Sequence, residues 1–115
     1  MVETDEKGGH EYGWMTDEYL RRINIAVGNA ERVIKKFGDK YDIIITADHG
    51  GHDRGHGLDI KEDMTIPIFM LGKHFKKNKE LTGVSILDLA PTICDLFGLH
   101  VEREWQGKSR LSHKD

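Results

Sequence analysis

Residues 41–57 read YDIIITADHGGHDRGHG, an apolar strand-forming run that leads directly into a loop dense in histidine and aspartate. Three histidines and two aspartates fall within residues 48–56, and glycines separate them. Imidazole nitrogen and carboxylate oxygen are ligands that zinc and similar divalent ions prefer. Glycine lets a loop turn tightly enough to aim several side chains at one point. Because α/β proteins build sites where strands end, this segment predicts a metal site.

The longest amphipathic pattern precedes this strand and predicts a helix over residues 16–37. Thr16 is a suitable N-cap, because its hydroxyl can accept a hydrogen bond from the first turn. Apolar residues then recur every three to four positions from Leu20 to Phe37, the period of a helix that covers a sheet. Gly38 ends the pattern, as glycine commonly does.

A second strand and a second helix follow the histidine-rich loop. Residues 65–71 form an apolar run in which Pro67 favours a strand start or an edge position. Residues 85–97 have a helical period, and Pro91 suits the first turn of the helix proper. We therefore expect an α/β fold with a small, largely parallel sheet flanked by helices. The sheet would hold Tyr41–Ala47 and Thr65–Leu71.

Two polar segments, residues 2–13 and 58–64, are expected to be loops. The first of them holds Asp5, Glu6 and His10. A carboxylate four or five positions before a histidine can reach the same ion when a turn brings both inward. This spacing leaves the choice of carboxylate open, and a solvated acidic loop would have the same composition.

The bulk composition fits one small domain and argues against several classes of protein. The 115 residues are 37% hydrophobic and 32% charged, which is polar but not typical of a disordered chain. The net charge is −3 and the basic residues are spread out, so we expect no nucleic-acid footprint. No apolar run could span a bilayer and no signal peptide is visible, which slightly favours a cytoplasmic location. The single cysteine, Cys94, excludes an internal disulfide.

The segment Thr46-Ala47-Asp48-His49-Gly50-Gly51-His52-Asp53 resembles the metal-binding motif of the alkaline phosphatase superfamily, in particular its type I phosphodiesterase/nucleotide pyrophosphatase group. Other segments resemble the same family in the same order. They are Gly9–Trp14, His56-Gly57, Thr65–Ile68, Asp88–Ile93, Phe97–Leu99 and Trp105–Ser109. The ordered set covers most of the chain and is more specific than the Asp-His-Gly motif alone.

The resemblance implies two divalent ions that flank a phosphoryl group, with zinc expected and manganese or another ion as the alternative. The implied metal ligands are Asp5, His10, Asp48, His49 and His56. Glu6 is an alternative to Asp5, because the family places its aspartate four residues before the histidine. His52 is an alternative to His56, or else it supports a ligand or the substrate and is held by Asp53.

The resemblance also implies a function for a parent enzyme. It would hydrolyse phosphodiester or nucleotide pyrophosphate bonds in a small phosphate-ester substrate. The alternatives are phosphomonoester, phosphonate or sulfate ester hydrolysis, a phosphomutase reaction, or a stand-alone metal-binding module.

No segment resembles the family's N-terminal region, which carries the threonine or serine nucleophile. Residues 1–115 are therefore expected to be the C-terminal, metal-binding part of a larger enzyme. Without the nucleophile, this part alone should be inactive. A bare edge of its sheet could be covered by self-association.

Overall fold

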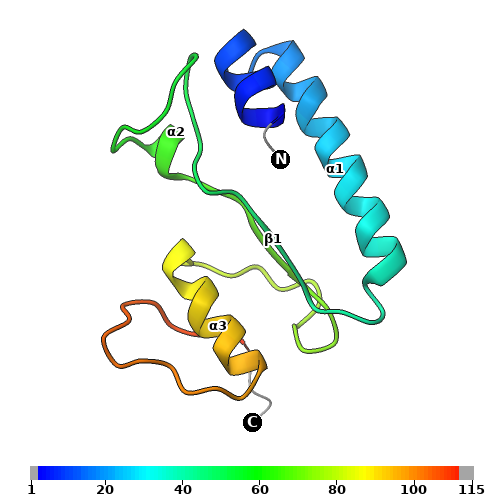
Figure 1. Cartoon of the computed structure of the whole chain (residues 1–115), viewed down its shortest axis with the longest axis vertical. Coiled ribbons are helices and arrows are strands. Elements are labelled where there is room, and N and C mark those ends of the chain that lie inside the picture. The colour runs from blue at the N-terminus through cyan, green and yellow to red at the C-terminus, as the bar shows by residue number, and fades with distance from the viewer. Residues whose placement is uncertain (1–2, 112–115) are drawn as a thin grey trace.

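A computed structural model describes residues 3–111 of the chain. The elements, in order, are the π-helix η1 Glu3–His10, α1 Asp17–Phe37, β1 Ile43–Thr46, α2 Lys61–Met64, β2 Ile68–Leu71, the 3-10 helix η2 Ile86–Asp88 and α3 Leu89–Leu96. Figure 1 shows the two strands in the middle of the molecule, with η1 and α2 towards its upper end and α3 below. The segments that carry the expected ligands therefore share one end of the molecule.

The long helix before the strand is confirmed. Thr16 caps α1, and its hydroxyl accepts a hydrogen bond from the Tyr19 backbone N–H at 3.3 Å. Asp17 and Glu18 follow in the first turn, where the helix dipole favours acidic side chains. At the other end, the Gly38 N–H donates to Ile34 O at 2.7 Å.

The expectation of a largely parallel sheet is wrong. β1 and β2 form a two-stranded antiparallel sheet in which Ile43 pairs with Leu71 and Thr46 pairs with Ile68. Parallel neighbours need a crossover connection, usually a helix. The long helix α1 precedes both strands and cannot serve as one, and only the four-residue α2 lies between them. The chain therefore turns back on itself through the histidine-rich loop.

Both segments expected to be loops contain helical structure. Residues 3–10 form the π-helix η1, in which Gly8 and Gly9 are buried. Residues 61–64 form α2. The Gly50 N–H donates a hydrogen bond to the carbonyl oxygen of Asp63 in this helix, at 2.7 Å. Both helices contact other parts of the chain, η1 against α1 and α2 against the histidine-rich loop, and such contacts can override local sequence preference.

The expected C-terminal helix is divided into η2 and α3, with Pro91 in the first turn of α3. Ser85 and Asp88 form a capping box at the start of η2. Asp88 is 3% exposed and also accepts hydrogen bonds from Lys108 N at 2.9 Å and Arg110 Nε at 2.7 Å. Asp88 therefore ties the C-terminal segment to the helix.

Apart from Pro91, which is buried, apolar side chains remain at least partly exposed in residues 3–111. No aliphatic or aromatic residue in this range is buried, whereas Asp63, Asp88 and Thr92 are. Val27 on α1 is 49% exposed and Phe69 on β2 is 58% exposed. Self-association through a bare sheet edge stays a prediction. Within the same range, no helix is both long and apolar enough to cross a membrane.

Candidate metal centre

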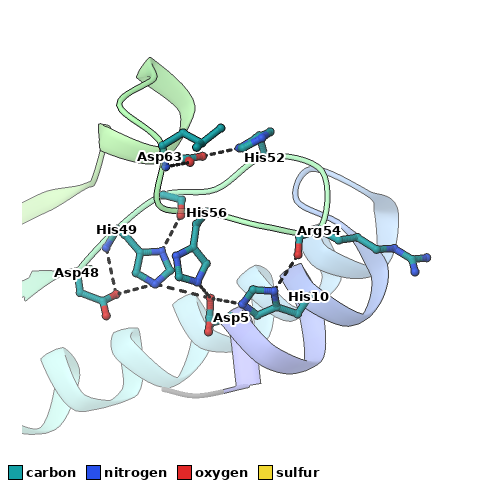
Figure 2. Close-up of polar contacts among 10 residues, drawn as sticks. Asp5, His10, Asp48, His49, His52, Arg54, His56 and Asp63 are labelled. Carbon is teal, nitrogen blue, oxygen red and sulfur yellow. Dashed lines mark hydrogen bonds and ion pairs between the residues drawn. The ribbon is translucent and has the colours of Figure 1, made fainter.

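Three of the expected ligands come together at the upper end of the molecule. Asp5, His10 and His56 each offer one ligand atom, and these atoms lie within 4.8 Å of one another. Nε2 of His10 and Nε2 of His56 are each 3.7 Å from Asp5 Oδ1. Figure 2 shows these side chains converging from η1 and from the histidine-rich loop, residues 48–57. Two imidazoles and a carboxylate form a ligand set suited to zinc or manganese.

Asp5, rather than Glu6, is the carboxylate that lies beside His10. Both acidic residues belong to the π-helix η1, and Asp5 Oδ1 is 3.7 Å from His10 Nε2. Glu6 is exposed and is not among the residues whose ligand atoms converge. Ligation by Asp5 stays a prediction, but the geometry favours it.

Hydrogen bonds from the imidazoles leave their Nε2 atoms available as ligands. His10 Nδ1 lies 2.8 Å from the Arg54 carbonyl oxygen, and His49 Nδ1 lies 2.7 Å from the Gly50 carbonyl oxygen. Because a carbonyl only accepts, Nδ1 of each ring carries the proton. In the neutral ring Nε2 then carries the lone pair, which is the form that binds a metal.

Asp5 Oδ1 is buried and has no hydrogen-bond partner. The imidazole atoms that surround it, including His49 Nε2 at 3.7 Å, are too distant for hydrogen bonds. A buried carboxylate oxygen without a donor is costly. A cation held by Asp5, His10 and His56 would supply the missing partner of Asp5 Oδ1, so the residues present fit a divalent ion.

Asp48 and His49 lie directly beside this group. His49 Nε2 is 3.7 Å from Asp48 Oδ1, and the His49 ring stacks on His56 with centroids 3.7 Å apart. The Asp48 side chain is 88% exposed and so is open to further ligands. A second site half formed by this pair stays a prediction.

His52 points away from Asp5 and lies on the α2 side of the loop (Figure 2). Its Nδ1 is 2.7 Å from Oδ1 of Asp63, whose side chain is 1% exposed. Asp63 also accepts a hydrogen bond from Leu58 N at 2.8 Å. The expectation that Asp53 holds His52 is wrong, because the partner is Asp63. Asp53 is exposed, and its carbonyl accepts a hydrogen bond from Trp14 N instead.

The pair shifts the pKa of both partners. The hydrogen bond to Asp63 raises the pKa of His52 above its usual value of 6.5. Burial alone would raise the pKa of Asp63, but hydrogen bonds from His52, Leu58 and Gly57 outweigh it and lower that pKa. Sequence analysis missed Asp63, which lies in a polar run with no ligand-like spacing.

Comparisons with known proteins found distant relatives. The chain is 29% identical over 97 residues to a 2,3-bisphosphoglycerate-independent phosphoglycerate mutase of Cellvibrio japonicus (strain Ueda107), covering 81% of this chain and 18% of that protein. It is 31% identical over 101 residues to the enzyme of the same name from Clostridioides difficile (strain 630), covering 81% and 19%. It is 27% identical over 101 residues to the extracellular sulfatase SULF-1 homolog of Drosophila melanogaster, covering 80% and 9%. These relatives are alkaline phosphatase superfamily enzymes.

The chain spans only 9% to 19% of the length of these relatives. No family model and no solved structure matches it. The relatives support the superfamily resemblance, but as mutases and a sulfatase they do not specifically support its phosphodiesterase branch.

Proposed function

We propose that this chain carries metal-ligand segments of a divalent-metal-dependent enzyme of the alkaline phosphatase superfamily. One observation carries the proposal: the buried, unpartnered Oδ1 of Asp5 faces Nε2 atoms of three histidines at 3.7 Å. Asp5, His10 and His56 would hold one ion, and Asp48 with His49 would supply half of a second site.

For the reaction, we place phosphoryl transfer of the phosphomutase type first and sulfate ester hydrolysis second. Most of the relatives described above are phosphoglycerate mutases, and one is a sulfatase. Both reactions develop negative charge on oxygens around a tetrahedral centre, which bound divalent ions neutralise. Phosphodiester hydrolysis, favoured by the sequence alone, ranks below these two because no relative described above carries that name.

The chain's own residues would position the ions and leave room for the substrate. Three protein ligands, as in the first site, leave an open position for a substrate oxygen. The carbonyls of Arg54 and Gly50 fix the orientation of His10 and His49. We propose that the attacking group comes from a part of the parent enzyme outside residues 1–115.

Metal titration of paired histidine variants tests this proposal. Zinc and manganese chloride would each be titrated calorimetrically into the wild-type chain, His56→Ala and the matched control His52→Ala. We expect His56→Ala to weaken binding by more than about 100-fold and His52→Ala by much less, because loss of an outer partner typically costs about 10–100-fold. Inorganic phosphate should then bind to the metal-loaded wild-type chain but not to His56→Ala.

Two outcomes would contradict the proposal. Failure of the wild-type chain to bind either ion would reject the metal site. Loss of binding in His52→Ala with retention in His56→Ala would reject the assigned ligand set.

A further inference from the structure

Trp14 connects the two segments that carry the candidate ligands. It follows η1, and its backbone N–H donates to the Asp53 carbonyl of the histidine-rich loop at 2.6 Å. The preceding residue, Gly13, has φ +101°, a backbone conformation that favours glycine. A Cβ at Gly13 would lie 3.2 Å from Asp53 O. The turn after η1 is therefore pressed closely against the loop.

The Trp14 indole fills the space between the backbones of these two segments. A Cβ added to Gly9 would overlap the outer edge of its six-membered ring, at Cη2, Cζ3 and Cζ2. A Cβ added to Gly51 would overlap a different part of the ring, at Cε2, Cδ2 and Nε1. The indole thus contacts a glycine of η1 and a glycine of the histidine-rich loop, and neither position leaves room for a methyl group.

The same ring contacts one candidate ligand from each segment. The indole centroid lies 5.3 Å from the His10 ring and 5.9 Å from the His56 ring, both in edge-to-face geometry. Such aromatic contacts favour a defined ring orientation. The two imidazoles are themselves 5.0 Å apart between centroids.

We propose that Trp14 is a positioning residue for the metal centre. Its indole sets the separation of η1 from the histidine-rich loop, and so brings the Nε2 atoms of His10 and His56 to the same oxygen of Asp5. Gly9 and Gly51 are required because any side chain there would displace the ring. This inference rests on the proposed metal-binding function, although the positioning itself concerns the metal-free chain.

A double-mutant cycle tests the steric part. In the wild-type background, Gly51→Ala should displace the indole and weaken zinc binding by about 10-fold or more, as loss of groups that orient ligands commonly does. Trp14→Ala should weaken binding to a similar extent. In the Trp14→Ala background, Gly51→Ala should have almost no further effect, because the ring it would strike is absent. Trp105→Phe is the matched tryptophan control and should bind zinc like the wild type.

Nuclear Overhauser contacts in the metal-free chain provide a second readout. Contacts between His10 and His56 ring protons should be present in the wild type and in Trp105→Phe, and lost in Trp14→Ala and Gly51→Ala. Circular dichroism of α1 would show that the variants remain folded.

The two measurements separate the possible failures. Persistence of the His10–His56 contacts in both Trp14→Ala and Gly51→Ala would overturn the positioning role, as would equal zinc losses from Gly51→Ala in both backgrounds. If the wild type bound no metal but lost the ring contacts on Trp14→Ala, the proposed function would fail and the positioning role would stand.

Discussion

Asp5 in η1 and Asp88 in η2 are aspartates in opposite halves of the chain, and they differ in what surrounds them. Asp88 is 3% exposed, and both of its oxygens accept hydrogen bonds, from backbone N–H groups and from Arg110. Asp5 has a buried oxygen with no hydrogen-bond partner, surrounded by imidazole nitrogens. The Asp88 carboxylate has hydrogen-bond donors and stabilises the fold. The Asp5 carboxylate faces imidazole lone pairs instead, an environment that a bound cation would satisfy.

The pKa of Asp88 reflects this supply of donors. Burial by itself raises that pKa, but hydrogen bonds from Lys108, Ser85 and Arg110 outweigh it, and the pKa falls below the usual 3.8. A group with a lowered folded-state pKa stabilises the protein above its unfolded-state pKa. Its contribution is lost as the pH falls through the lower value. At neutral pH Asp88 therefore contributes fully.

The largest expected effect is on stability and comes from removing Asp88, the carboxylate with hydrogen-bond donors. Asp88→Ala would leave Arg110 and two backbone N–H groups without their acceptor. Removing one partner of a buried ion pair typically costs about 3–5 kcal/mol of unfolding free energy. Urea unfolding followed by circular dichroism measures the loss. Asp39→Ala, which removes an exposed aspartate, is the control. An equal loss of unfolding free energy in both variants would show that the hydrogen bonds of Asp88 contribute little to stability.

The second prediction concerns Asp5, the carboxylate whose Oδ1 has no hydrogen-bond donor. Asp5→Asn should leave the metal-free chain as stable as the wild type or more so, because Oδ1 has no donor to lose and an amide can donate to an imidazole. With zinc at 100 times its Kd, the wild type should gain about 2.7 kcal/mol and Asp5→Asn very little.

Urea unfolding with and without zinc measures both parts of this prediction. Glu6→Gln is the matched control and should keep the zinc-dependent gain, because Glu6 is not among the residues whose ligand atoms converge. If Glu6→Gln lost the gain while Asp5→Asn retained it, the ligand would be Glu6.

Local patterns predicted what depends on local sequence. Helix α1 runs from Asp17 to Phe37 with its cap at Thr16, because capping and apolar period act within a few residues. Positions of the strands followed from their apolar runs, but their relative direction did not. That direction depends on how the histidine-rich loop docks against α2, where the Gly50 and Gly51 N–H groups donate to backbone carbonyls of α2.

The candidate site was predicted by residue type but not by geometry. The sequence indicated Asp5, His10 and His56, while leaving Glu6 and His52 open as alternatives. Only the structure shows that Asp5, five residues before His10 in η1, has its Oδ1 3.7 Å from His10 Nε2. Asp63 gave no signal, because its pairing with His52 depends on the loop docking against α2.

The smallest expected effect concerns Asp63, whose surroundings are intermediate between those of Asp88 and Asp5. It is buried like Asp88, but its side-chain partner is the titratable His52 rather than an arginine. Since the pair raises the pKa of His52, nuclear magnetic resonance titration should give a value above 6.5 for His52 in the folded chain. A raised pKa means that the ion pair stabilises the fold fully below pH 6.5 and ceases to do so as the pH rises through the folded-state value. The stability difference between wild type and His52→Gln should therefore shrink from pH 6 to pH 9, while Asp88→Ala costs the same throughout. A measured pKa of His52 at or below 6.5 would contradict this prediction. It would show that Asp63, like Asp5, lacks a strong interaction with the neighbouring imidazole.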